Sequence, residues 1–117
     1  MTDERARPLR FDLDSHEVPV GAVIALYRRG DLPRIVPVLS ARVVLGRTPP
    51  ADIVVPVVTV SRRQCTFDFS GGLCVVEDLH STGGTYLRGA QIHGSTTLAE
   101  GDILSVGDLH IEVRRGP

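Results

Sequence analysis

Three short polar segments interrupt a run of β-forming sequence between Val43 and Leu87, and their residue types could bind an anion. In chain order they read Gly46-Arg47, then Ser61-Arg62-Arg63-Gln64, then Asp78-Leu79-His80-Ser81-Thr82-Gly83-Gly84-Thr85. Each segment places an arginine, a hydroxyl or a glycine where one strand is expected to end and the next to begin. Guanidinium groups, hydroxyls and exposed backbone N–H groups on a rigid scaffold are the donors that a phosphate needs. The sequence therefore predicts an anion-binding surface built from loops.

The residues around these segments predict an all-β fold. The chain has 117 residues, of which 42% are hydrophobic, with 12 glycines and 8 prolines, and valine is abundant. Short apolar or alternating runs separated by glycine and proline turns are typical of a β-sandwich, and no run has the period of a helix. We expect strands at about 20–28, 35–39, 42–46, 53–55, 65–69, 73–77, 85–87, 96–98, 103–106 and 109–113, with a further β position at Ile92.

The ends of the chain are more polar than its middle. Residues 1–17 are polar and mixed in charge and are expected to form a flexible tail, residues 18–114 one folded domain, and residues 115–117 a short C-terminal tail. The first residues have no apolar core of the kind a signal peptide carries, and the longest apolar stretch, 18–27, is far below the ~20 residues of a membrane span. We therefore expect a cytoplasmic protein that does not bind a membrane.

Composition and spacing argue against several other functions. The net charge is −1, so the chain lacks the basic character that nucleic-acid binding requires. All 13 basic residues are arginine, so every cation can make a bidentate contact to a phosphate. The histidines and cysteines lack metal-ligand spacing, and no nucleophile elbow is present. Cys65 and Cys74 would stand about four residues, or ~13 Å, out of register across their hairpin, which is too far for a disulfide. We expect neither an enzyme, nor a metal site, nor a cofactor.

The order and spacing of the polar segments resemble the forkhead-associated (FHA) domain, a module that reads phosphothreonine. Gly46-Arg47 matches its Gly-Arg, the second segment matches three-quarters of its Ser-x-x-His, and the third follows its Asp-x-x-Ser-x-Asn-Gly-Thr except at one position. The resemblance covers roughly residues 20 to 113. It implies an FHA-like β-sandwich of about eleven short, mostly antiparallel strands, with loops at one end that bind a peptide.

The resemblance also assigns roles to individual residues. It implies that four side chains contact the phosphate: Arg47, Ser61, Arg62 and Thr82. Gly83 stands where the family has an asparagine that hydrogen-bonds the peptide backbone, and Gln64 replaces a histidine that supports the loop. Arg88 occupies a second asparagine position and is expected to face the peptide, where its guanidinium could compensate for Gly83.

The function implied by the resemblance is recognition of a phosphothreonine-containing protein or peptide in Ser/Thr kinase signalling. The chain is expected to be a monomer or to self-associate weakly. Gly83 and Arg88 leave an alternative open, because both depart from the family at the binding surface. The alternative is a degenerate FHA fold that docks a protein without phosphate, or that self-associates.

Overall fold

The structure is a computed structural model that describes residues 7–116, and within that range it consists of eleven strands joined by turns and loops, with no helix. The strands are β1 (Ala22–Arg28), β2 (Arg34–Pro37), β3 (Arg42–Gly46), β4 (Ile53–Val54), β5 (Cys65–Asp68), β6 (Val75–Asp78), β7 (Tyr86–Leu87), β8 (Ala90–Gln91), β9 (Ser95–Thr97), β10 (Leu104–Val106) and β11 (Leu109–Arg115). The ten predicted strands are thus present, and most boundaries differ by one or two residues, as expected where edges fray. The predicted β position at Ile92 is wrong by a residue, because β8 ends at Gln91.

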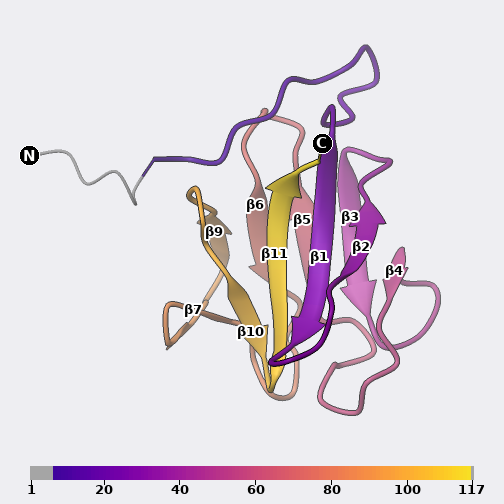
Figure 1. Ribbon diagram of the computed structural model, residues 1–117, viewed down its shortest axis with the longest axis vertical. Coiled ribbons are helices and arrows are strands. Elements are labelled where there is room, and N and C mark those ends of the chain that lie inside the picture. The colour runs from indigo at the N-terminus through magenta and orange to yellow at the C-terminus, as the bar shows by residue number, and fades with distance from the viewer. Residues whose placement is uncertain (1–6, 117) are drawn as a thin grey trace, which may run out of the picture.

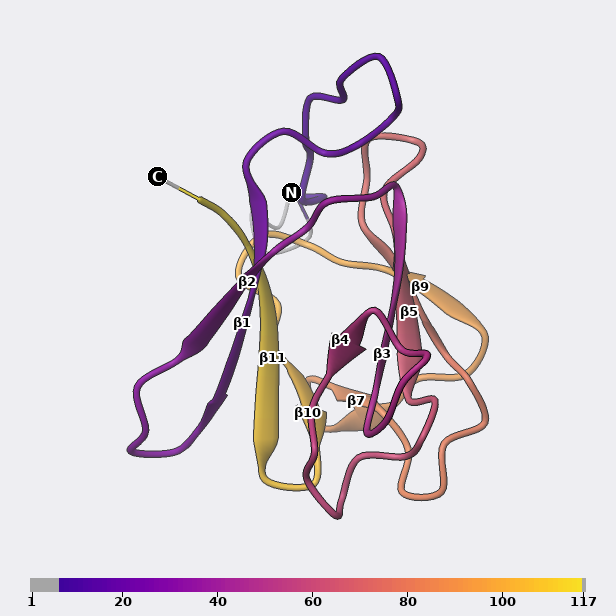
Figure 2. The same cartoon turned by 90° about the vertical axis from the view of Figure 1, so that its right-hand side faces the viewer.

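Two sheets face each other, as Figure 2 shows. One sheet has the strand order β2-β1-β11-β10-β7-β8 and the other β4-β3-β5-β6-β9. Every pair is antiparallel except β3 with β4, where Leu45 pairs with Ile53 in parallel register. The prediction of an FHA-like β-sandwich with about eleven short, mostly antiparallel strands is confirmed.

The core lies between the sheets because alternate residues of each strand point inward. In β11 buried and half-buried residues alternate from Leu109 to Val113. Phe67, Phe69 and Ile24 are fully buried at its centre. Cys65 lies opposite Asp78, four residues from Cys74, and both cysteines are free and buried. The absence of a disulfide between them is therefore confirmed, and the thiols act as small core side chains.

The N-terminal segment contradicts the prediction of a flexible tail up to residue 17. Leu9 and Phe11 are buried with 4% and 8% exposure, and their N–H groups donate to the carbonyls of Leu98 (3.0 Å) and Gly72 (2.8 Å). The segment crosses the end of the sandwich opposite the loops that carry the polar segments (Figure 1). Apolar residues at 9 and 11 alternate with polar ones, so the pattern of a short packed strand was hidden in an overall polar stretch. Residues 1–6 lie outside the described part of the chain.

The predicted C-terminal tail, residues 115–117, was placed one residue too early, because β11 ends at Arg115. Arg115 belongs to β11 and pairs with Ala22 of β1. Its guanidinium donates to the Arg10 carbonyl (Nη2, 2.7 Å) and lies 5.4 Å from the centre of the Phe11 ring. The end of β11 therefore fastens the N-terminal segment, and the folded unit includes the described residues before residue 18. Residue 117 is outside the described range.

We predict that Phe11→Ala lowers the unfolding free energy by about 3 kcal/mol, because it removes a buried ring that packs edge-on against Phe69 at 5.6 Å. Urea unfolding of the full chain measures this change. Val20→Ala is the matched control, since Val20 is 60% exposed at the same end of the molecule. A change of less than about 0.5 kcal/mol for Phe11→Ala, the size expected of a surface substitution, would show that the segment does not contribute to the fold.

Candidate functional site

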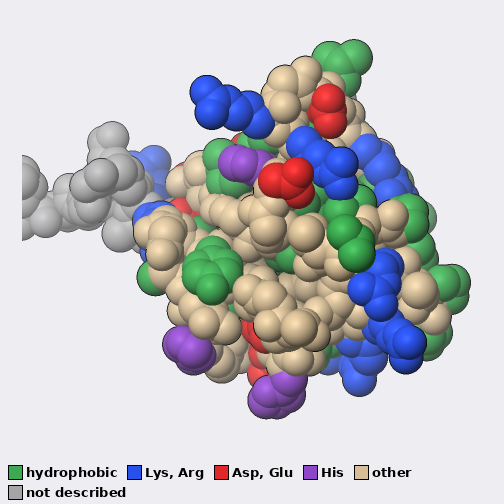
Figure 3. Space-filling view, turned by 90° about the horizontal axis from the view of Figure 1, so that it is seen from below, with side chains coloured by type: hydrophobic (Ala, Val, Ile, Leu, Met, Phe, Trp, Pro, Cys, Tyr) green, Lys and Arg blue, Asp and Glu red, His purple; other side chains and the backbone are tan. Residues whose placement is uncertain are grey.

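The three polar segments converge at one end of the sandwich, around an open pocket of about 780 Å³ that we call the loop pocket. None of the described lining residues carries a carboxylate, and the polar lining side chains are Arg47, Thr59, Ser61, Arg62, Arg63, His80 and Thr82. Arginine side chains gather along one side of this end of the molecule, with hydrophobic side chains beside them (Figure 3). The pocket therefore presents positive charge and hydrogen-bond donors without a competing acid, which suits an anion.

Arg47 is held against the second polar segment by an unusually close backbone contact. Gly46 ends β3 so near to Arg62 that a Cβ built on it would lie 2.0 Å from the Arg62 carbonyl oxygen, so only glycine fits there. The next residue, Arg47, donates its N–H to the Ser61 carbonyl (2.9 Å) and its Nη1 to the Val60 carbonyl (3.0 Å). A guanidinium has five N–H donors, so most of them remain available to a ligand.

Ser61 joins the second and third polar segments. Its Oγ accepts a hydrogen bond from the N–H of Thr82 at 2.9 Å, while the hydroxyl proton has no acceptor among the described residues. Ser61 can therefore donate to an anion in the pocket while it holds the Thr82 loop in place. The same contact brings Thr82 to the pocket wall.

Gln64 supports this arrangement from inside the protein. It is fully buried, and its Oε1 accepts the N–H of Ser61 at 2.9 Å. Its Nε2 donates to the Gly84 carbonyl (3.1 Å) and to the Thr85 hydroxyl (2.9 Å). A buried amide leaves no orphaned polar atom when every donor and acceptor is used in this way. Gln64 thus connects the two loops, which is the supporting role that the resemblance gives to a histidine.

Asp78 is connected to Gln64 through the Thr85 hydroxyl, which accepts from Gln64 and donates to Asp78. Its Oδ1 accepts the Thr85 hydroxyl at 2.7 Å and the Ser81 hydroxyl at 2.6 Å, and its Oδ2 accepts the Ser81 N–H at 3.0 Å. Burial by itself would raise the pKa of Asp78, but these hydrogen bonds favour the ionised form and together hold the pKa below its usual value. An ionised Asp78 therefore orders the third polar segment.

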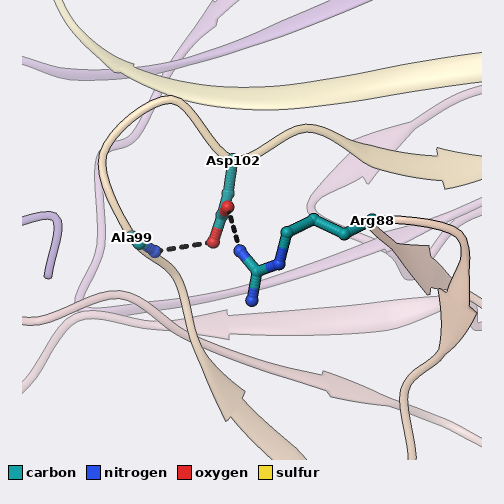
Figure 4. Close-up of polar contacts among 3 residues, drawn as sticks. All are labelled: Arg88, Ala99 and Asp102. Carbon is teal, nitrogen blue, oxygen red and sulfur yellow. Dashed lines mark hydrogen bonds and ion pairs between the residues drawn. The ribbon is translucent and has the colours of Figure 1, made fainter. Parts of the chain in front are cut away.

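Arg88 does not reach the loop pocket. It is the first residue of the two-residue turn between β7 and β8, where both Arg88 and Gly89 have positive φ (49° and 79°), as a type I′ hairpin turn requires. Its guanidinium pairs with the carboxylate of Asp102, which also accepts the Ala99 N–H at 2.7 Å (Figure 4). The turn therefore directs Arg88 toward the loop before β10, away from the position that would compensate for Gly83.

The structure thus brings together five of the six predicted site residues: Arg47, Ser61, Arg62, Thr82 and Gly83. The pocket lining also contains six residues that were not among the predicted site residues: Val58, Thr59, Val60, Arg63, His80 and Gly107. Arg63 and His80 lie within the second and third polar segments, so the motifs around them could have marked them as site residues. Gly107 comes from the turn between β10 and β11, and nothing in its local sequence marks it as part of a site.

We predict that Asp78→Asn destabilises the protein at neutral pH and that the difference from wild type shrinks in acid. The folded-state pKa of Asp78 lies below the ordinary value of about 3.9. Its contribution is therefore present above about pH 4 and lost as pH falls through the folded-state pKa. For this partly exposed carboxylate we expect a loss of about 1 kcal/mol at pH 7.

Urea unfolding between pH 7 and pH 2.5 measures this effect. Asp31→Asn is the control, because Asp31 is exposed and its carboxylate makes no hydrogen bond to a described residue. A gap between Asp78→Asn and wild type that stays constant across the whole pH range would contradict the assignment.

Comparison with known proteins agrees with this geometry. Residues 43–107, more than half of the 117-residue chain, match the FHA domain. The glycogen accumulation regulator GarA of Mycolicibacterium smegmatis is 33% identical over 107 residues, which cover 86% of this chain and 63% of GarA. The oxoglutarate dehydrogenase inhibitor of Corynebacterium efficiens is 32% identical over 107 residues, which cover 86% of this chain and 70% of that protein.

A solved structure gives the same result at the level of the fold. It comes from a structural and functional analysis of phosphothreonine-dependent FHA domain interactions, and it superimposes with a TM-score of 0.68 at 28% identity, covering 81% of this chain and 98% of the other. This chain spans less than two thirds of the length of GarA. On the family match and the identity to these relatives, the chain belongs to the FHA domain family.

Proposed function

We propose that this chain recognises a phosphothreonine-containing protein in Ser/Thr kinase signalling and binds it through the loop pocket. The observation that carries the proposal is the convergence of Arg47, Arg62 and Arg63 with the uncommitted hydroxyl proton of Ser61 around one pocket without a carboxylate. The structural relative from the study of phosphothreonine-dependent interactions supports the same reading.

The mechanism is charge-assisted hydrogen bonding. A phosphothreonine carries about two negative charges and three acceptor oxygens near pH 7. Arg47 supplies the main charge contact, since its backbone and one guanidinium nitrogen are already fixed to the neighbouring loop. Ser61 and the exposed Arg62 and Thr82 fill the remaining acceptors. Hydrogen bonds between ionised partners are about twice as strong as neutral ones, so a few such contacts discriminate phosphothreonine from threonine.

The proposed role is recognition rather than catalysis. The curated relatives are a regulator and an inhibitor. Within the described residues no group of three or more histidine, cysteine or acidic side chains could hold a metal ion. That same range also contains no helix long and apolar enough to cross a membrane. Two buried free thiols fit a reducing compartment, and we infer a cytoplasmic location.

A second candidate function is docking without phosphate, and one residue favours it. Gly83 lines the loop pocket but has no side chain with which to bind a peptide backbone, and Arg88 is engaged with Asp102 instead. The two candidates differ in one measurable respect. The phosphate-reading site loses its ligand when the threonine is not phosphorylated, whereas a phosphate-independent surface does not.

We predict that Arg47→Ala weakens binding of a phosphothreonine peptide by about ten- to a hundredfold, because hydrogen bonds to charged groups contribute about 1.5–3 kcal/mol. The peptide would be selected from a degenerate phosphothreonine library and its affinity measured by calorimetry, beside its unphosphorylated form. Arg42→Ala is the control, since Arg42 is exposed at the start of β3, the strand that Arg47 follows, but does not line the loop pocket. Equal affinity of Arg47→Ala and wild type would remove Arg47 from the site.

We predict that Gly83→Asn strengthens binding of the same peptide by about fivefold or more. The new side chain would offer the peptide backbone a donor and an acceptor, at about 0.5–1.5 kcal/mol each. The position accepts a side chain, because nothing lies within 4 Å of a Cβ built on Gly83 and its φ is not in the left-handed region. Gly71→Asn is a matched control, because Gly71 is an equally open glycine in the turn between β5 and β6 and does not line the loop pocket. No gain for Gly83→Asn, together with equal binding of the unphosphorylated peptide, would favour docking without phosphate.

A further inference from the structure

A second cleft, of about 410 Å³, lies beside the loop pocket, and we call it the apolar cleft. Leu26, Val55 and Leu109 line it although each is only 4% exposed, so its inner surface is the edge of the hydrophobic core. Leu32 and Pro56 border it from the outside. The cleft thus has an apolar wall on its inner side and is open to solvent on the other.

The two cavities are separated by a thin ridge. Residues 58–60 line the loop pocket and residues 55–57, the preceding stretch of the same segment, line the apolar cleft. The connection from β10 to β11 also borders both cavities. Gly107 of the turn lines the loop pocket, and Leu109, the first residue of β11, lines the cleft. The two segments touch, because a Cβ on Gly107 would lie 3.0 Å from the Thr59 Cβ. A ligand that fills the loop pocket therefore has only to cross this ridge to reach the cleft.

The ridge and the cleft carry the two large hydrophobic side chains with the greatest exposure among the described residues. Leu32, at the border of the cleft, is 94% exposed, and Val58, on the ridge, is 87% exposed. A single exposed hydrophobic side chain is ordinary. Exposed hydrophobic side chains beside an apolar cleft, here Leu32 at its border and Val58 on the neighbouring ridge, are typical of a binding surface. The apolar surface here is continuous with the proposed phosphate site.

The charged side chains of the cleft favour an acidic partner. Arg28, Arg34 and Asp31 line it. Arg34 donates to the Val54 carbonyl (2.9 Å) and has no carboxylate of the described residues within 4.0 Å. Arg28 lies 3.7 Å from Asp108, but both side chains are exposed, so this pair is weak. Arg34 is therefore the cation of the rim that no described carboxylate neutralises, and it complements a carboxylate beside an apolar anchor.

We propose that the apolar cleft anchors an apolar side chain of the same phosphoprotein whose phosphothreonine occupies the loop pocket, with an acidic residue next to that anchor meeting Arg34. This proposal rests on the proposed function and adds a second point of contact to it. An extended chain advances about 3.3 Å per residue, and a ridge of backbone with its side chains is roughly 10 Å across. About three residues are thus needed to cross the ridge, so the anchor lies at least four residues from the phosphothreonine.

The experiment uses a phosphothreonine peptide in a glycine-serine-alanine background, in which a Leu-Glu pair is moved through eight positions on each side of the phosphothreonine. Calorimetry with the full chain measures each affinity. We expect one position, at least four residues from the phosphothreonine, to bind about fivefold or more tightly than the background peptide, since burial of a leucine side chain is only partly offset by ordering. Replacing the glutamate by glutamine at that position should lose part of the gain.

Variants of the protein connect the gain to the cleft. Leu32→Ser should abolish the gain from the Leu-Glu pair while binding of the background phosphopeptide is unchanged. Leu39→Ser is the matched control, because Leu39 is 78% exposed but lines neither cavity, and it should keep the gain. Both substitutions are at exposed side chains, so neither should alter folding.

The outcomes separate this proposal from the proposed function. If the background phosphopeptide binds but no position of the Leu-Glu pair improves it, or if Leu32→Ser keeps the gain, the anchor is overturned and phosphothreonine binding stands. If no peptide binds in a phosphate-dependent manner, both are overturned. If sedimentation shows a dimer that Leu32→Ser abolishes, and the Leu-Glu pair gives no gain, the cleft belongs to a second copy of this chain and the proposal is wrong.

Discussion

The loop pocket depends on one buried residue, Gln64, because it is hydrogen-bonded within the second polar segment, to the third, and to the residue just before the first. Its N–H donates to the Leu45 carbonyl just before Gly46-Arg47, and its carbonyl accepts the Leu79 N–H of the third segment. Its side-chain amide holds Ser61 on one side and Gly84 and Thr85 on the other. The bonds to Gly84 and Thr85 are buried, so leaving either of them unmade would cost the desolvation of a polar group. The loops are thereby fixed before a ligand arrives, which lowers the cost of binding.

The arginines of the molecule have two kinds of partner, carboxylates on the body of the sandwich and carbonyl oxygens in the loop pocket. Arg88, Arg114 and Arg115 pair with Asp102, Glu112 and Glu100 along the body of the sandwich. In the loop pocket Arg47 is held by carbonyl oxygens, and no described carboxylate lies within 4.0 Å of it. A carbonyl fixes a guanidinium without neutralising it, whereas a carboxylate would compete with the ligand. The protein has a net charge of only −1, so the local arrangement, and not the overall charge, creates the anion site.

The two ends of the sandwich are built differently. At one end the N-terminal segment covers the core with Leu9 and Phe11 and is fastened by Arg115. At the other end the loops leave two cavities side by side, one lined with arginines and one with the edge of the core. Because the same ridge borders both, the phosphate site and the apolar cleft can be read by one continuous partner segment.

The sequence by itself predicted the strands and the sandwich, because alternation and glycine turns are local patterns. Through their resemblance to the FHA domain, its loop motifs also named five of the six proposed ligand-binding residues that line the loop pocket. The period-2 runs and the Gly-Arg, Ser-x-x and Asp-x-x-Ser segments predict which side chains stand at strand ends. The tertiary structure alone decided where Leu9, Phe11 and Arg88 go. Two apolar residues in a polar stretch become core only when a partner surface, here around Phe69, is available to cover. Arg88 turns to Asp102 because the hairpin geometry and an acid fourteen residues away act together. Such long-range contacts have no local signature, and the apolar cleft, whose lining comes from four separate stretches of chain, has none either.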